Sequence, residues 1–325
     1  MNMRFTKPKK VSTLDIRSFT EGTKNDVRNF IFELGTGLRE YGFVIIEGHG
    51  VSGELVKSCY AHTKSFFELP QETKSKYIIP QNAGQRGYTQ MKQEHAKDSQ
   101  HPDIKEFWHV GREHFTHSEN TERYPKNIWP TEHIPKFKDD FVELYSQLET
   151  MASTLLQATS LYLQLPKNTL SNMIVDGNSI IRALHYPALD EREFKSGAVR
   201  AAAHEDINFI TILCEATESG LELLTHDGQW LSVESGPGQM VVDSGDMLSR
   251  ICNNVIPSTT HRVVNPPTGQ NVARYSMPFF VHPHSQCELN VLKSCTTPQS
   301  PAKYPPILAD EFLRQRLREI GLIKN

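Results

Sequence analysis

The sequence predicts a mainly β protein with flanking helices, and three observations support this fold class. Apolar residues recur at helical spacing in the first half of the chain. Between Ser179 and His282, short β-branched and aromatic runs alternate with turns rich in Gly, Pro, Asp and Asn, as in a β-sandwich or barrel. A last amphipathic pattern, Leu308 to Ile320, predicts a helix near the end of the chain.

The first half of the chain is predicted to be mainly helical. Helical spacing of apolar residues indicates these helices: Asp26–Gly37, Glu54–Phe67, Gln71–Tyr77 and Phe137–Leu165. A short β-rich run, Gly42–Ile46, lies between the first two. Residues 78–135 contain several Gly and Pro residues and are expected to be mostly loop, which in a compact domain is often functional.

The second half is predicted to form the β core. Its expected strands are Ile180–Tyr186, Phe209–Leu213, Leu221–Thr225, Gln239–Val242, Met247–Ile251, His261–Val264 and Arg274–Val281. No linker rich in Gly, Ser or Pro divides the chain. We therefore expect one unit over residues 1–325, with a mainly helical region at 1–175, the β core at 176–285 and a C-terminal segment with a helix at 286–325.

Composition excludes several classes of function. The net charge of −3 predicts no attraction to nucleic acid or to an anionic membrane surface. No run approaches the roughly 18 apolar residues of a membrane span. The five cysteines are widely spaced and form no Cys-x-x-Cys pair, which argues against a thiolate zinc site and favours a reducing cytoplasm.

One cluster of motifs points to a metal. In His204-Glu205-Asp206, at the edge of a predicted strand, residues two apart share a face, so His204 and Asp206 point together and Glu205 points away. The same His-x-Asp pattern occurs at His101, in the loop-rich region, where we interpret it as a surface turn. His261 opens another predicted strand. Two histidines and one carboxylate are the ligands of a non-haem iron(II) site with open coordination positions.

A second motif points to a carboxylate. Arg274 and Ser276 share a face of a predicted strand and offer a guanidinium and a hydroxyl to one carboxylate. The run that follows, Met277–Val281, is largely apolar, and a charged group beside it is costly without a partner.

Together these motifs resemble the iron(II)- and 2-oxoglutarate-dependent oxygenases of the isopenicillin N synthase-like family. The resemblance covers most of the chain. Besides the motifs above, it rests on Tyr41-Gly42-Phe43, His49-Gly50-Val51, Phe66-Phe67-Glu68-Leu69-Pro70, Lys76-Tyr77, Asn127-Ile128-Trp129-Pro130, Gly245-Asp246 and His261-Arg262-Val263.

The resemblance implies a double-stranded β-helix (jelly-roll) core and a set of site residues. It implies that His204, Asp206 and His261 bind Fe(2+). It implies that Arg274 and Ser276 hold the far carboxylate of 2-oxoglutarate, with O2 as the other cosubstrate. Tyr186 matches a tyrosine that family members often direct at 2-oxoglutarate, although the family's usual asparagine two places earlier is Leu184 here.

The activity implied is decarboxylation of 2-oxoglutarate to succinate and CO2, coupled to hydroxylation or a related oxidation of a small organic substrate. Two alternatives stay open. Isopenicillin N synthase itself also has an Arg-x-Ser motif, which binds substrate, so a 2-oxoglutarate-independent iron oxidase is the first alternative. A non-catalytic metal-binding jelly-roll is the second.

The substrate-binding residues are less defined by the sequence. Arg86 and Tyr88, in a Gly-containing loop, and the neighbouring residues Phe107, Trp108 and His109 are candidates for lining the substrate pocket. His282 and His284 are expected in a surface turn. We expect a cytoplasmic protein that is a monomer or a weak dimer.

Overall fold

The computed structural model describes residues 10–82, 84–91, 93, 104–117, 120–188, 200–265 and 272–319. Within this part of the chain the helices are α1 (Arg17–Thr20), α2 (Lys24–Tyr41), α3 (Gly53–Phe67), α4 (Gln71–Ser75), α5 (Phe137–Tyr162), α6 (Thr169–Met173), α8 (Asp246–Ile251) and α9 (Ala309–Glu319), with short 3-10 turns at Pro80–Asn82 and Lys293–Cys295. Among them, none combines the length and apolar character needed to cross a membrane.

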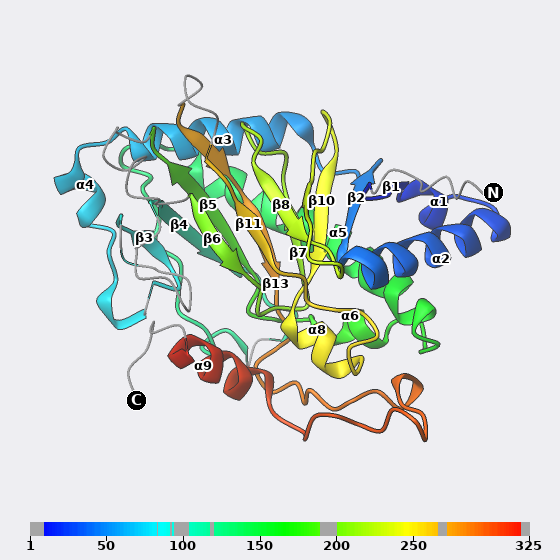
Figure 1. The fold of residues 1–325 in the computed structure, drawn as a ribbon. Coiled ribbons are helices and arrows are strands. Elements are labelled where there is room, and N and C mark those ends of the chain that lie inside the picture. The colour runs from blue at the N-terminus through cyan, green and yellow to red at the C-terminus, as the bar shows by residue number, and fades with distance from the viewer. Residues whose placement is uncertain are drawn as a thin grey trace.

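Two β-sheets form the centre of the molecule (Figure 1). The larger sheet has the order β1-β2-β10-β7-β13-β5-β4-β3, and β12 also pairs with β5. The smaller sheet has the order β6-β11-β8-β9. The strands are β1 (Thr13–Asp15), β2 (Phe43–Glu47), β3 (Gly87–Thr89), β4 (Glu106–Gly111), β5 (Ile180–Tyr186), β6 (Ala201–His204), β7 (Ile210–Leu213), β8 (Leu221–Leu224), β9 (Trp230–Ser232), β10 (Met240–Ser244), β11 (His261–Val263), β12 (Arg274–Ser276) and β13 (Pro278–Val281).

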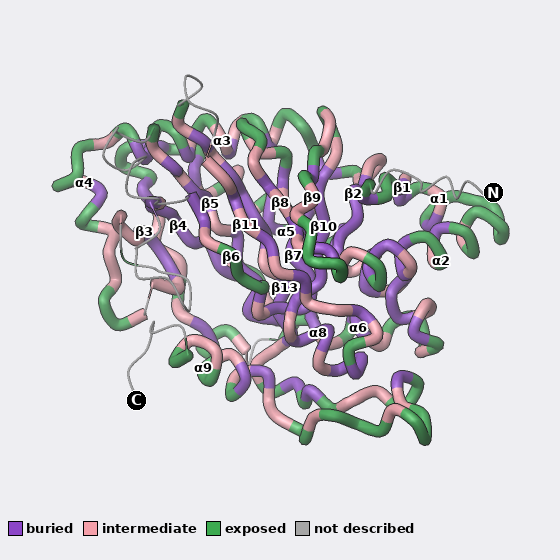
Figure 2. The backbone as a smooth tube through the Cα atoms, in the orientation of Figure 1, coloured by how far each residue is buried: buried purple, intermediate pink, exposed green. Residues whose placement is uncertain are grey.

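Helices α2, α3 and α5 pack together and cover one face of the larger sheet (Figure 1). Figure 2 shows the result as mostly buried strands, with exposed residues on the outer turns of α2 and α4. The other face of the larger sheet is turned toward the smaller sheet. A small cluster of buried residues, Phe107, Leu184, Tyr186, Ala201 and Val263, joins the two sheets.

Helix α2 shows how local sequence sets the element ends. Thr23 caps the first turn and exchanges hydrogen bonds with Asp26 in a capping box. Gly42 ends the helix with φ 67°, a left-handed conformation that favours glycine. A Cβ on Gly42 would also lie 2.1 Å from Oγ1 of Thr259, so glycine lets β2 begin close to the loop before β11.

The mainly β class with flanking helices is confirmed, and most predicted elements lie near their expected positions. The prediction of a strand at Met247–Ile251 is wrong, because these residues lie in α8. A short apolar run does not distinguish strand from helix. Strand β4 was also not expected, because every residue from Glu106 to Gly111 is buried and no alternation marks it.

A buried charge cluster ties β4 and β5 to the helices. Glu106 accepts hydrogen bonds from Nζ of Lys74 at 2.8 Å and from the Tyr88 hydroxyl at 2.5 Å. Nδ1 of His185 lies 2.8 Å from its other oxygen. Burial alone would raise the pKa of Glu106, but the hydrogen bonds from His185, Lys74 and Tyr88 lower it below its ordinary 4.5. The carboxylate is therefore charged at neutral pH.

We expect Glu106→Gln to lower the free energy of unfolding by roughly 3–5 kcal/mol, because it leaves Lys74 buried without its counter-charge. The pKa of Glu106 is depressed in the folded state. The contribution of its carboxylate to the free energy of unfolding is therefore complete above pH 4.5 and is lost as the pH falls below that value. Urea unfolding at several pH values measures both effects. Glu54→Gln, in the exposed Lys57 pair, is the control and should change nothing. Equal stability of Glu106→Gln and wild type would contradict this account.

Candidate metal centre

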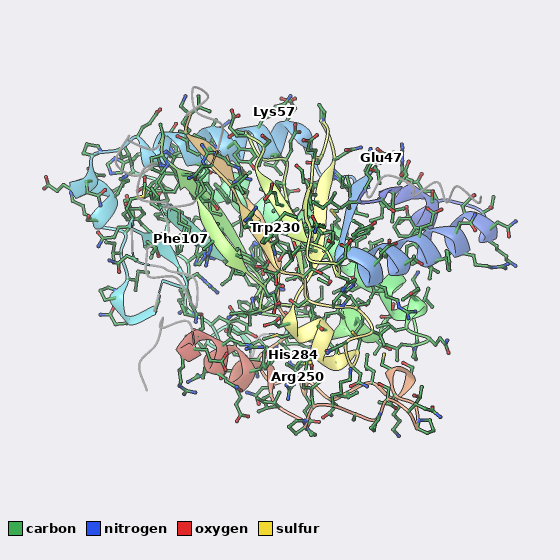
Figure 3. All side chains as sticks on the ribbon, viewed as in Figure 1. Glu47, Lys57, Phe107, Trp230, Arg250 and His284 are labelled. Carbon is green, nitrogen blue, oxygen red and sulfur yellow. The ribbon has the colours of Figure 1, made fainter. Side chains whose placement is uncertain are left out.

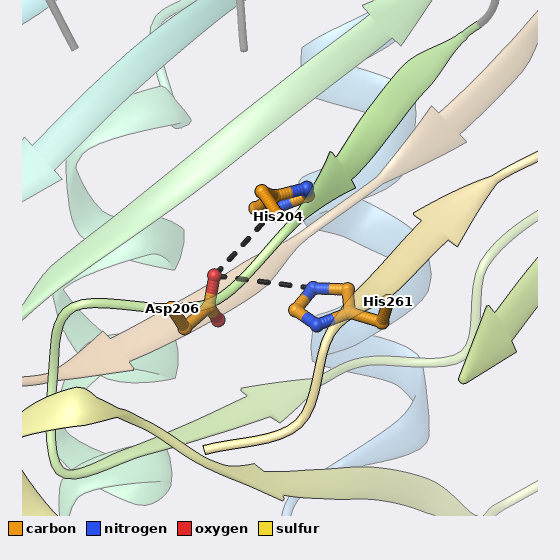
Figure 4. Close-up of side chains that lie close together, drawn as sticks. All are labelled: His204, Asp206 and His261. Carbon is orange, nitrogen blue, oxygen red and sulfur yellow. Dashed lines mark ion pairs between the residues drawn. The ribbon is translucent and has the colours of Figure 1, made fainter. Parts of the chain in front are cut away.

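His204, Asp206 and His261 meet between the two sheets (Figure 4). His204 ends β6 and His261 begins β11, and the antiparallel register places them directly opposite each other. Asp206 follows His204 by two residues and turns its carboxylate toward both rings. The sequence therefore brings together two residues by local spacing and the third by strand pairing.

The distances suit a metal ion. Oδ1 of Asp206 lies 3.8 Å from Nε2 of His204 and 3.9 Å from Nε2 of His261. Two ligands at about 2.1 Å from one metal are separated by at most roughly 4.2 Å. The His204 side chain is 41 % exposed, so the centre opens to the outside on that side.

Both imidazoles are oriented by their second nitrogen. Nδ1 of His204 lies 2.8 Å from the carbonyl of Ala202, and Nδ1 of His261 lies 3.1 Å from the carbonyl of Thr259. Each Nδ1–H thus donates to a backbone carbonyl, which leaves the Nε2 lone pair directed toward Asp206. Metal-binding histidines are held in this way.

Electrostatics favour the protonation states that bind a metal. Although part of the His204 side chain is exposed, the protein around the rest of the ring desolvates it, and this effect and next the charge of His261 lower its pKa to about 4, so the ring is neutral at pH 7. Burial would raise the pKa of Asp206, but His261, His204 and the Thr211 hydroxyl lower it. Burial and the nearby Asp206 charge raise the pKa of Asp243 well above its usual value, so this neighbouring carboxyl ionises less readily than an ordinary aspartate.

The segment that follows β6 is fixed by backbone contacts. The amide of Asp246, at the start of α8, donates to the carbonyl of Asp206 at 2.7 Å. A Cβ on Gly245 would lie 2.4 Å from the carbonyl oxygen of Asn208, so only glycine allows this approach. Glu205 points away, as predicted, and accepts a hydrogen bond from Thr260 at 3.0 Å.

The predicted carboxylate-binding residues lie on β12 and β5. Arg274 pairs with Tyr186, and its guanidinium lies 5.3 Å from that ring. Arg274 and Ser276 are 2 % and 3 % exposed. Nε of Arg274 donates to the carbonyl of Glu218 at 3.0 Å, whereas the buried Nη1 has no partner in the part of the chain that the structure describes. An orphaned guanidinium N–H beside a buried hydroxyl fits a ligand carboxylate.

Three of the substrate candidates from the sequence, Arg86, Tyr88 and Trp108, lie elsewhere. Tyr88 and Trp108 belong to the main core, where Trp108 packs edge-on against Phe66 at 4.7 Å. Arg86 is fully buried and close to Gly111, with Nη2 donating to Asn178. We therefore correct that expectation: these side chains support the sheet from its helix-covered side and do not face the three ligands.

The other two candidates, Phe107 and His109, lie beside Arg182, a residue that the sequence did not suggest. Nε of Arg182 donates to Nε2 of His109 at 2.6 Å, and Nδ1 of His109 lies 2.6 Å from the carbonyl of Gly84. The Arg182 guanidinium lies 4.3 Å from the Phe107 ring and 5.2 Å from the Phe280 ring. Its charge also lowers the pKa of Asp206. Strand alternation could have grouped Arg182 with Tyr186, but could not show which face is inside.

His282 was expected in a surface turn, and that expectation is wrong. It is only 8 % exposed, burial lowers its pKa to about 4, and its Nδ1 has no partner. Figure 3 shows Phe107 among the strands and the neighbouring His284 below them. The second His-x-Asp pattern, at His101, lies outside the described residues.

Two family models match the chain. Residues 11–132 match the model described as non-haem dioxygenase in morphine synthesis N-terminal. Residues 177–283 match the 2OG-Fe(II) oxygenase superfamily model, and this segment contains all three candidate ligands as well as Arg274 and Ser276.

Individual relatives agree with these models. The 2-oxoglutarate-Fe(II) type oxidoreductase hxnY of Emericella nidulans is 30% identical over 84% of this chain and 79% of its own. A 2OG-Fe(II) oxygenase family protein from Caulobacter crescentus is 42% identical, with a TM-score of 0.85 over 96% of this chain and 99% of its own. A full-length protein from Neurospora crassa, solved in complex with alpha-KG and thymine, is 26% identical, with a TM-score of 0.84 over 95% and 96% of the two chains.

We expect His261→Ala to weaken binding of a divalent metal by more than roughly 100-fold, because even the hydrogen-bond partners of metal ligands contribute 10- to 100-fold. Isothermal titration with Fe(II) or Mn(II) under anaerobic conditions measures this. His226→Ala, which removes an exposed histidine after β8, should bind metal like wild type. Unchanged affinity in His261→Ala would refute the assignment.

Proposed function

The chain belongs to the 2OG-Fe(II) oxygenase superfamily, in its isopenicillin N synthase-like branch, and we therefore propose that His204, Asp206 and His261 bind its iron(II). The protein is an oxygenase with a jelly-roll core that uses iron(II), 2-oxoglutarate and O2 to oxidise a small organic substrate. Whether that oxidation is a hydroxylation, and of which substrate, is part of the proposal.

One observation carries the assignment of roles. Two histidines with anchored Nδ1 atoms and one carboxylate converge on a single point and leave the other side open. Iron(II) held by these residues would, with 2-oxoglutarate and O2, supply an oxidant for an unactivated C–H bond, with succinate and CO2 as coproducts.

The chain's own residues orient and shield the reactants. We assign the far carboxylate of 2-oxoglutarate to Arg274 and Ser276, because Arg274 is buried and has an unpartnered N–H. Tyr186, whose ring lies beside the Arg274 guanidinium, closes the same end of the site. These groups exclude water from the cosubstrate end, so the attraction between the Arg274 guanidinium and the carboxylate of 2-oxoglutarate is strong there.

The substrate is assigned to the surface around Arg182. Its guanidinium is positioned by His109 and by the rings of Phe107 and Phe280. The positive charge of Arg182 also lowers the pKa of Asp206. His282 adds a buried imidazole just after β13. This surface suits a compact molecule that presents a carbonyl or carboxylate oxygen to Arg182. The thymine bound in the Neurospora crassa structure makes pyrimidine bases the first class to test.

Three further features belong to the same proposal. We propose that residues 1–325 form one oxygenase unit, with the regions 1–175, 176–285 and 286–325 as expected from the sequence. In support, β1–β4 of the first region are strands of the larger sheet. We also propose a cytoplasmic location, since all five cysteines are free and buried, and a monomer or weak dimer without nucleic-acid or membrane partners.

The activity test is succinate release from 2-oxoglutarate with Fe(II), across pyrimidine bases, amino acids and small organic acids. We expect substrate-stimulated succinate formation and oxygen uptake that stops when 2-oxoglutarate is omitted. Oxygen uptake without 2-oxoglutarate would instead establish the iron-oxidase alternative. Tight metal binding without turnover of any candidate would favour the non-catalytic jelly-roll.

We expect Arg182→Met to raise KM for the primary substrate at least about tenfold, because it removes a charge-assisted hydrogen bond. The affinity for 2-oxoglutarate should stay unchanged. Arg182 lies near the start of β5, whereas Arg274 on β12 pairs with Tyr186 at the end of β5. Steady-state kinetics with each substrate varied in turn separate the two constants. Arg314→Gln, on the exposed side of α9, is the control. A rise in both constants would contradict a substrate-specific role.

A further inference from the structure

Two buried arginines lie at the cosubstrate end of the site, and only one was expected. Arg200 is 1 % exposed and Arg274 is 2 % exposed. Within the described ranges, each retains a buried N–H without a partner, Nε in Arg200 and Nη1 in Arg274. Arg200 directly precedes β6, the strand that ends at His204.

Hydrogen bonds bring the Arg200 guanidinium to the start of β12. Its Nη2 donates to the carbonyl of Val272, and its backbone N–H donates to Oδ1 of Asn265 at 3.1 Å. Val272 precedes Arg274 by two residues, which span at most about 7 Å of extended chain. Arg200 therefore contacts the chain that leads into β12. The charges of both Arg274 and Tyr186 act on Arg200, and the Arg274 guanidinium lies 5.3 Å from the Tyr186 ring, so the two arginines lie in the same region.

Among the described residues, neither guanidinium forms an ion pair with a carboxylate. Burial, and next the positive charge of Arg274, lower the pKa of Arg200. The carboxylate that acts on Arg200 is Glu218, whose side chain is exposed and which gives Arg274 only its backbone carbonyl. Two like charges held together in a dry place are unfavourable unless an anion lies between them.

We propose that Arg200 is a second guanidinium of the cosubstrate site, which binds the far carboxylate of 2-oxoglutarate together with Arg274 and Ser276. This inference rests on the proposed function. A carboxylate has two oxygens and about four acceptor positions, enough for Nε of Arg200, Nη1 of Arg274 and a hydroxyl. Arg200 also links the cosubstrate to β6, and hence to the strand that carries His204.

A specific consequence is selectivity among 2-oxo acids. Chelation of the metal needs only the keto group and the adjacent carboxylate, which 2-oxovalerate also has. Only 2-oxoglutarate offers a far carboxylate to the arginine pair. Arg200 should therefore contribute to binding of 2-oxoglutarate and contribute nothing to binding of 2-oxovalerate.

The test is anaerobic binding without turnover, by titrating 2-oxoglutarate or 2-oxovalerate into the Mn(II)-loaded protein. We expect Arg200→Gln to weaken 2-oxoglutarate binding roughly 10- to 100-fold and to leave 2-oxovalerate and Mn(II) affinity unchanged. Arg200→Lys, which keeps the charge, should recover part of the loss. Arg250→Gln is the matched control, because Arg250 also has a partly buried guanidinium with an unpartnered Nε and an Nη2 bonded to a carbonyl, but lies on α8.

Each outcome decides between the two proposals. Wild-type affinity for 2-oxoglutarate in Arg200→Gln would overturn the arginine pair and leave the proposed function standing. An equal loss for both 2-oxo acids would also overturn it, because it would indicate general damage to the site. If the wild-type protein itself binds no 2-oxoglutarate, both the pair and the 2-oxoglutarate dependence fall.

Discussion

The antiparallel pairing of β6 with β11 is the constraint that sets the geometry of the site. It places His204 opposite His261, with ring centroids 4.4 Å apart, and the two backbone carbonyls that orient the rings come from the same two chain segments. Asp206 needs only the turn after β6 to reach both. Because the backbone of Asp206 is also held by Asp246, the ligand geometry is set by main-chain contacts, which are rigid, instead of by flexible side chains.

The cosubstrate end depends on the opposite face of the larger sheet. Tyr275, between Arg274 and Ser276 on β12, stacks on His185 at 4.9 Å. His185 in turn contacts Glu106, which neutralises Lys74 from α4. The buried charges behind the sheet thus fix the strands whose front face carries the proposed carboxylate-binding residues. Helix packing and ligand binding are linked through the alternation of side chains along β12 and β5.

The charges inside the site are separated along its length. At the metal end His204 is neutral at pH 7, the pKa of Asp206 is lowered and the pKa of Asp243 is raised, which limits the negative charge there. The far end holds Arg274 and Arg200. A dianionic 2-oxo acid that chelates a divalent metal with one end and meets the arginines with the other complements this arrangement. In a dry interior such complementarity is worth more than at the surface.

The amino-acid sequence was enough to identify the three candidate ligands and the Arg274–Ser276 motif, because their pairing follows from spacing along one strand and from a family pattern. It was also enough for most helices and strands, where periodicity is clear. Which face each residue serves became known only from the folded chain. Phe107 and Trp108 are equally buried neighbours on β4, yet one joins the cluster between the sheets and the other the helix-covered core. Arg200, Arg182 and His282 gained their positions only because strands distant in sequence converge, a fact that no local pattern encodes.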